Sequence, residues 1–282
     1  MQPGILLKVV RPANVLLMGI GVIVGYVIST GELQLSPELL AGTMTCGLYT
    51  AFAMVTNDIV DIDIDRVNEP SRPIPSGKLK EEEAMLFSVA ILVAGVVAGG
   101  ATFNIWFVTI PPIVAFMCVV YNLYLKRMGL LGNVLVSALV AMSFVGGGLI
   151  AVGHVETYLI LFALVAFLGN LGREVHKGIP DTEGDRRRGV MTIAVTYGAR
   201  TAKWLAVSLY MTAVLLSLFP IVLGITNQYY PYAIAVVAVL LIASSVRILR
   251  MDDASALRRE KNLVRVWMLL AMLAFVIGAL RI

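Results

Sequence analysis

Two groups of aspartates follow long apolar stretches of the chain, and their spacing predicts metal binding. The first group is Asn57-Asp58-Ile-Val-Asp61-Ile-Asp-Ile-Asp65. On a helix, its intervals of three and four residues place four polar side chains on one face, whereas Asp63 points away. The four are Asn57, Asp58, Asp61 and Asp65. A row of carboxylates repels itself unless a cation binds, and Mg²⁺ takes one or two carboxylates and leaves its other positions to water and phosphate oxygens, so the group predicts a magnesium site.

The second group, Asp181-Thr-Glu-Gly-Asp185, again separates two carboxylates by four residues, with Glu183 projecting elsewhere. Alone this spacing is weak evidence for a metal site, because it occurs by chance in solvated helices. It gains weight because it resembles the first group, which suggests an internal duplication. Two such clusters can hold two Mg²⁺ ions across one diphosphate and neutralise that leaving group as a carbon–oxygen bond breaks. The expected catalytic residues are Asp58, Asp61, Asp181 and Asp185, and the expected metal ligands are these four with Asp65.

Neighbouring polar groups are candidates for phosphate binding, since a diphosphate needs several hydrogen-bond donors. The expected substrate-binding residues are Asn14, Asn57, Arg66, Arg72, Lys126, Arg173 and Lys177. For each base, a position set by membrane topology is an equally good interpretation, and for Asn14 helix capping is the alternative. The prolines of Ser71-Arg-Pro-Ile-Pro-Ser-Gly77 give this loop a defined shape, which makes it a candidate lid.

Composition indicates which elements carry these residues. The chain has 282 residues, of which 59% are hydrophobic and 14% charged, and its mean hydropathy is +0.88. Soluble domains are roughly 45–50% apolar and 25% charged, so a bilayer is the expected solvent. Apolar runs of spanning length, about 20 residues, occupy 12–30, 38–57, 83–102, 104–122, 131–152, 156–173, 202–223, 230–249 and 263–280. The predicted fold is all-α: a polytopic membrane protein with nine transmembrane helices in one bundle, helical cytoplasmic loops after helices two and six, and a single domain over 1–282.

The charged residues gather at one end of these helices. When each Lys and Arg is assigned to the nearer helix end, all of the 22 except Arg281 lie on the side of the N-terminus. By the positive-inside rule that side is cytoplasmic, which predicts a cytoplasmic N-terminus and active site and an external C-terminus in the cell membrane. The same rule accounts for the net charge of +4, so nucleic acid is not an expected partner. A solvated acidic helix end is the alternative to a metal site, but it is costly beside a membrane.

Other chemistries find little support in the sequence. Cys46 and Cys118 lie in apolar runs and are too few for a disulfide framework. His176 has no cysteine or histidine partners in the second motif, so zinc is not expected. The sequence contains no glycine-rich dinucleotide motif, Walker sequence or nucleophilic triad, and covalent catalysis is not indicated.

Taken together, the motifs resemble those of the UbiA-type superfamily of intramembrane prenyltransferases. The resemblance covers nearly the whole chain and rests on N-D-x-x-D-x-x-x-D after helix two and D-x-x-x-D after helix six. Within the superfamily, Arg11-Pro-Ala-Asn14, residues 57–77 and the string from Arg173 to Asp185 are most similar to the archaeal digeranylgeranylglyceryl phosphate synthases. The superfamily's diphosphate and metal residues fall here on Asn14, Asn57, Asp58, Asp61, Asp65, Asp181 and Asp185.

This resemblance implies an Mg²⁺-dependent enzyme, with two ions, that transfers a geranylgeranyl group from geranylgeranyl diphosphate to the sn-2 hydroxyl of geranylgeranylglyceryl phosphate. The implied partners are an isoprenoid diphosphate donor, a lipid-like phosphate acceptor and membrane lipid. Relatives that act on aromatic acids often carry proline after the tyrosine of the helix-four loop, whereas Asn122 follows Tyr121 here. Two alternatives stay open: prenyl transfer to an aromatic quinone precursor or haem, and divalent-cation transport, which would place acids near the membrane midplane.

Overall fold

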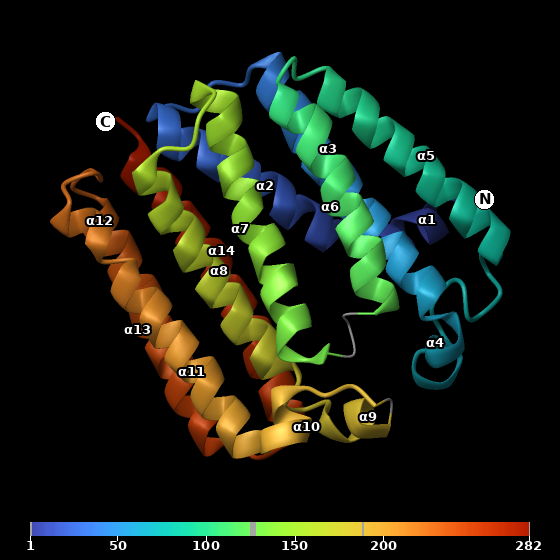
Figure 1. Cartoon of the computed structure of the whole chain (residues 1–282). Helices are drawn as coiled ribbons and strands as arrows, with labels where there is room; N and C mark the ends of the chain where they lie inside the picture. Colours follow the sequence, from blue (N-terminus) through green and yellow to red (C-terminus); the bar gives the residue numbers. More distant parts are fainter. Residues whose placement is uncertain (1, 125–127, 188, 282) are drawn as a thin grey trace. The chain divides into compact units, whose positions relative to one another are not determined.

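The computed structural model describes residues 2–124, 128–187 and 189–281, and every regular element in these ranges is a helix (Figure 1). Nine of the helices described are long and apolar enough to cross a membrane. This confirms the all-α, multi-pass architecture. Close contacts group the chain into two compact units, a finer division than the expected single domain. The first unit contains the chain up to Ile23 and Gln34–Tyr124, and the second contains Val24–Leu33 and the described residues that follow Tyr124.

The first unit is built around one long central helix. Its elements are α1 (Pro3–Val10), the first part of α2 (Pro12–Thr30), α3 (Pro37–Val60), α4 (Ile62–Asn68), α5 (Glu81–Gly100) and α6 (Ile105–Leu123). Helix α3 packs against both α5 and α6. Its buried side chains Phe52 and Val55 share an apolar cluster with Ile74 and Leu79. Because the cluster includes the segment after α4, the core of this unit also fixes the loop that follows the first aspartate motif.

The second unit holds the remaining helices. These are α7 (Leu130–Val152), α8 (Thr157–Lys177), α9 (Thr182–Arg187), α10 (Ile193–Tyr197), α11 (Ala199–Leu216), α12 (Phe219–Val222), α13 (Tyr230–Arg250) and α14 (Ala254–Ala279), with the end of α2. Helix α8 packs against α7, α11 and α14, and α13 packs against α14. Close approach needs a small residue where α2 meets α7: a Cβ on Gly25 would lie 1.9 Å from the backbone oxygen of Phe144.

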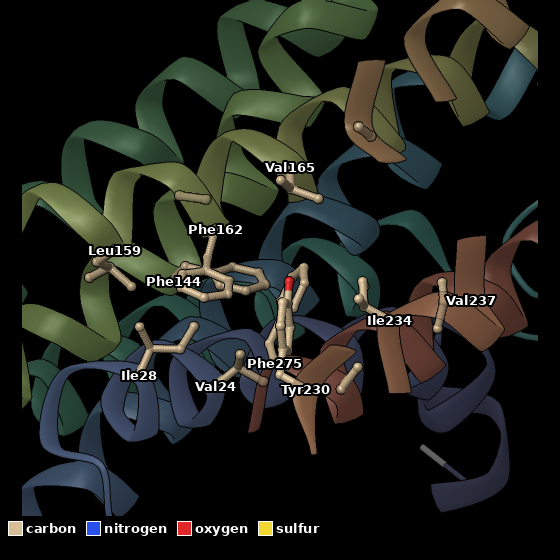
Figure 2. Close-up of a cluster of buried hydrophobic side chains, with 13 residues drawn as sticks. Val24, Ile28, Phe144, Leu159, Phe162, Val165, Tyr230, Ile234, Val237 and Phe275 are labelled. Carbon is tan, nitrogen blue, oxygen red and sulfur yellow. The ribbon is translucent and has the colours of Figure 1, made fainter. Parts of the chain in front are cut away.

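Aromatic side chains fill the core of the second unit. Figure 2 shows Phe144, Phe162 and Phe275 pointing toward one another, with Tyr230 beside them. The rings of Phe162 and Phe275 meet edge to face with centroids 5.0 Å apart, an arrangement that matches the charge distribution of aromatic rings. The buried hydroxyl of Tyr230 donates a hydrogen bond to the carbonyl oxygen of Ser217 at 2.8 Å, so this polar atom is satisfied inside the core.

The helix limits depart from the sequence expectation mainly outside the apolar runs. The last spanning helix begins at Ala254 and not near 263, and residues 3–10, which precede the first apolar run, form α1. Asp253 explains the early start, because its side chain accepts a hydrogen bond from the backbone N–H of Ala256 at 2.7 Å and so caps α14. An apolar run shows only the part of a helix that suits lipid, whereas the helix itself continues into polar surroundings. As a result, the bases between Arg258 and Arg265 lie on a helix and not partly in a loop.

Candidate active site

The first aspartate motif spans a helix boundary. Asp61 is both the last cap of α3 and the first cap of α4, so the motif is not one unbroken helix. The helical hydrogen bonds nevertheless continue through it: the N–H of Asp61 donates to the carbonyl of Asn57 at 3.0 Å, and its own carbonyl accepts from the N–H of Asp65 at 2.8 Å. Asp58, Asp61 and Asp65 are therefore buried together, while the side chain of Asp63 is 92% exposed. The expected division between inward and outward acids is confirmed.

Two arginines pair with two of these buried carboxylates, those of Asp58 and Asp65. Arg11, between α1 and α2, donates to Oδ1 of Asp58. Arg72 lies 2.5 Å from Oδ2 of Asp65 and 3.6 Å from Oδ1 of Asp58, so one guanidinium serves two acids. Buried carboxylates require such compensation, because an unpaired charge in a low-dielectric interior is strongly destabilising. Arg72 was an expected member of the site, whereas Arg11 was not.

The loop that carries Arg72 has a defined conformation, as its prolines predicted. The carbonyl of Pro73 accepts hydrogen bonds from the N–H of Leu79 at 3.0 Å and the hydroxyl of Ser76 at 3.2 Å. Ile74 and Leu79 are buried in the core of the first unit. These contacts hold Arg72 against the acids. A role for the loop as a lid stays a prediction.

Asn14 lies beside the same cluster. Its side-chain nitrogen is 3.4 Å from the sulfur of Met54, and Arg11 contacts the same sulfur at 3.7 Å. Met54 is one helical turn before Asp58, so Asn14, Arg11 and the first motif meet in one place. Two other expected residues are placed differently. Arg66 pairs with the exposed Asp63 at 2.9 Å, away from the buried acids, and Lys126 lies outside the described residues.

The second motif repeats the local construction of the first. Asp181 stands directly before the short helix α9, as Asp61 stands directly before α4. The carbonyl of Asp181 accepts from the N–H of Asp185 at 2.9 Å, which matches the bond between Asp61 and Asp65. Glu183 occupies the place of Asp63 and is likewise exposed, by 70%, with an ion pair to Arg187 at 3.2 Å. This equivalence supports the duplication inferred from the sequence.

Basic residues also accompany the second motif. Arg173 and Lys177 on α8 share the carboxylate of Glu174, at 2.9 and 3.1 Å. Asp181 pairs with Arg258 of α14 at 3.0 Å, a residue that the sequence had not singled out. The partners stand 77 residues apart in the chain, so only the folded packing of α14 against the second motif reveals them.

The donor atoms of both motifs suit magnesium. Mg²⁺ binds through one or two carboxylates and completes its shell with water and phosphate oxygens, and each motif offers a pair of aspartates for this. Within the described ranges, no three acidic, histidine or cysteine side chains gather closely enough to coordinate an ion by themselves. Asp58 and Asp65 lie within 3.6 Å of the same guanidinium, so one cation can interact with both.

Comparison with known proteins identifies relatives over nearly the full length. The model of the UbiA prenyltransferase family matches residues 18–279. The digeranylgeranylglyceryl phosphate synthase of Methanococcus aeolicus is 31% identical over 97% of this chain and 97% of its own, and that of Methanocaldococcus jannaschii is 34% identical over 98% and 96%. A solved structure of digeranylgeranylglyceryl phosphate synthase matches with a TM-score of 0.80 and 31% identity, covering 99% of each chain. A UbiA homologue from Archaeoglobus fulgidus bound to GPP and Mg²⁺, 19% identical over 96% of this chain and 99% of its own, shares the fold with a TM-score of 0.67.

Proposed function

Because this chain belongs to the UbiA prenyltransferase family and is a prenyltransferase of the membrane, we propose that it transfers the geranylgeranyl group of geranylgeranyl diphosphate to the sn-2 hydroxyl of geranylgeranylglyceryl phosphate. The product is an archaeal ether lipid precursor. The observation that carries the chemistry is the repeated motif, which presents a pair of aspartates directly before and within a short helix in each unit. The names of the full-length relatives support the choice of acceptor.

The reaction exchanges one carbon–oxygen bond for another. The bond between C1 of the donor and its diphosphate breaks and leaves its electron pair on the phosphate oxygen. The acceptor hydroxyl forms the new bond to C1, and diphosphate and a proton are released. Bound Mg²⁺ would supply positive charge at the leaving group. The residues that would hold it are Asp58, Asp61 and Asp65 in the first motif and Asp181 and Asp185 in the second. The apolar helices exclude the bulk water that would otherwise capture the reacting carbon.

Arg11 and Arg72 take part in the same proposal. In the structure they neutralise Asp58 and Asp65. When metal takes over that neutralisation, both guanidiniums become available to donate to the phosphate oxygens of the donor, for which their planar fork is well suited. Asn14 and Asn57 would add amide donors at the same place, and Lys177 would add an ammonium group near the second motif.

Asparagine variants of both motifs test this function, with geranylgeranyl diphosphate, geranylgeranylglyceryl phosphate and mass spectrometry of the product. Asp61→Asn and Asp181→Asn should each lower kcat/KM on the order of 100-fold or more, because each removes a metal ligand. Their matched controls are Asp63→Asn and Glu183→Gln, which change exposed acids of the same motifs and should stay within about twofold of the unmodified enzyme.

The double variant tests whether the motifs act together. If both serve one donor diphosphate, Asp61→Asn combined with Asp181→Asn should cost little more than either change alone. If the double variant instead lost kcat/KM by the product of the two single losses, the motifs would act independently and would not share one diphosphate. Transfer to an aromatic quinone precursor or haem, with no transfer to geranylgeranylglyceryl phosphate, would keep the prenyltransferase and refute the proposed acceptor.

A further inference from the structure

Helices α8 and α14 bring together more positive charge than their carboxylates balance. Arg173 and Lys177 on α8 share the single carboxylate of Glu174. Lys261 and Arg265 on α14 are both repelled by Arg173, whereas Asp181 attracts Lys261 and Glu174 attracts Arg265, so two carboxylates face four cations. Among the residues that the structure describes, the side chains of Lys261 and Arg265 make no ion pair and no hydrogen bond. The cluster therefore has an excess of cations, which an anion would stabilise.

Membrane topology does not explain these two cations. A base that anchors a helix to lipid head groups extends toward the outside, as the exposed Arg259 does. Lys261 and Arg265 are only partly exposed, and their charged neighbours lie on the packed side of α14. Holding two partly buried cations near other cations is unfavourable unless a ligand compensates for it.

Unsatisfied donors mark the same location. The hydroxyl of Tyr210 on α11 is fully buried and has no hydrogen-bond partner in the described part of the chain, and neither has Nε of Arg173. The Tyr210 ring lies against α8, since a Cβ on Gly172 would be 2.8 Å from its Cε1, and its hydroxyl interacts electrostatically with Arg173 and Glu174. Buried polar atoms are rarely left unpaired, so these donors indicate a missing acceptor.

An apolar pocket lies further along the same two helices. Its lining is almost entirely apolar, which suits a hydrocarbon chain. On α14, Met268, Met272 and Phe275 line it, and they follow Lys261 and Arg265 at spacings of three and four residues, which keep all five on one helix face. On α8, Gly169 and Ala166 line it below Arg173 in the same way. The cations and the apolar pocket thus follow one another along the same faces of α8 and α14 and form a track, whose pocket is lined in part by Phe144 and Phe275 of Figure 2.

We propose that this track binds the prenyl acceptor, with its phosphate on Arg173, Lys261 and Arg265 and its isoprenoid chain in the pocket of the second unit. The inference rests on the proposed function, because it assigns a place to that acceptor. An anionic head joined to a long apolar chain matches both ends of the track. Tyr210 would donate its hydroxyl hydrogen to the phosphate. Lys261 also interacts with Asp181, which places the head of the acceptor next to the second aspartate motif.

The charged end is tested by Lys261→Gln and Arg265→Gln. Each should raise KM for geranylgeranylglyceryl phosphate roughly 10- to 100-fold, the value of a hydrogen bond to a charged group, with KM for geranylgeranyl diphosphate and kcat nearly unchanged. Geranylgeranylglycerol, which lacks the phosphate, should bind the variants and the unmodified enzyme equally. Lys261→Arg should retain most of the affinity. The matched control is Arg259→Gln, which removes the same charge from the exposed side of the same helix.

The apolar end is tested by Gly169→Leu. A Cβ at Gly169 would be 3.8 Å from Cε of Met268, an ordinary contact, so the backbone can carry a side chain there and leucine reaches into the pocket. Gly169→Leu should raise KM for the geranylgeranyl acceptor and shift preference toward acceptors with a shorter chain. A rise in KM for the donor alone would assign the pocket to the donor chain and overturn the proposal.

Direct binding separates this inference from the proposed function. Native mass spectrometry with geranylgeranylglyceryl phosphate should show a complex that Lys261→Gln and Arg265→Gln weaken but Arg259→Gln does not. If the unmodified enzyme transfers to this acceptor and the two glutamine variants bind it normally, the inference fails and the proposed function stands. If no transfer occurs but the selective binding is seen, the proposed function fails and the site stands. Equal displacement by a diacyl phospholipid would indicate a structural lipid and overturn the assignment.

Discussion

Arg72 occupies a position where two buried carboxylates depend on one cation. Its guanidinium is within 3.6 Å of both Asp58 and Asp65, and Arg11 provides the second charge for Asp58. Buried acids are stable only while they are neutralised, by arginine or by metal. If metal replaces arginine as we propose, Arg72 would connect the stability of the first motif with substrate binding.

Arg72→Gln should expose this dependence. Without Mg²⁺, the free energy of unfolding should fall by about 1–3 kcal/mol, because buried carboxylates lose a charged hydrogen-bond partner. Added Mg²⁺ should stabilise the variant more than the unmodified protein, since the ion takes over the missing neutralisation. Thermal unfolding in detergent, with and without Mg²⁺, measures both effects.

Arg66→Gln is the matched control for that experiment. Arg66 stands one residue after Asp65 but pairs with the exposed Asp63, so its loss should change stability by no more than about 0.5 kcal/mol. Equal effects of Mg²⁺ on Arg72→Gln and Arg66→Gln would contradict the exchange of arginine for metal.

At the scale of elements, local periodicity was the part of the site that the sequence could predict. The inward Asp58 and outward Asp63 follow from the helical repeat, which depends only on neighbours in the chain. The partners Arg11 and Arg258 escaped prediction, because they lie 47 and 77 residues from the aspartates that they contact. Such pairs depend on which helices pack together. Hydropathy located all nine spans, but it could not show that α14 extends beyond its apolar run.

The cap of α14 decides how firmly that extension is held. Hydrogen bonds from the hydroxyl of Ser255 and the N–H of Ala256 lower the pKa of Asp253, so the charged cap persists above the ordinary value of 3.8 and is lost only as the pH falls below it. Asp253→Ala should speed hydrogen exchange in the first turn of α14 at neutral pH. It should also weaken binding of the acceptor, because Lys261 lies two turns further along the same helix.

The control for this cap is Asn262→Ala, an exposed position of the same helix. It should leave hydrogen exchange in the first turn unchanged. Unaltered exchange in Asp253→Ala would show that packing, and not the cap, maintains the start of α14.

For the whole molecule, the distribution of charge predicts one orientation in the membrane. Of the 22 lysines and arginines, all but Arg281 lie nearest to the helix ends on the same side of the membrane as the N-terminus. The positive-inside rule places those ends in the cytoplasm, together with both aspartate motifs. An isoprenoid diphosphate donor would then reach the active site from the cytoplasm, where such compounds are made. The prenyl chains would remain in the lipid bilayer.

Cysteine labelling in intact cells tests that orientation. With Cys46 and Cys118 replaced by alanine, Gln228→Cys marks the link between α12 and α13, and Glu82→Cys marks the first turn of α5, both exposed positions. A membrane-impermeant maleimide should label Gln228→Cys in intact cells but Glu82→Cys only after permeabilisation, because nine spans with this charge distribution put the two on opposite sides. The opposite pattern would invert the topology and place both motifs outside the cell. Labelling of both before permeabilisation would mean that at least one of the nine helices does not cross the bilayer.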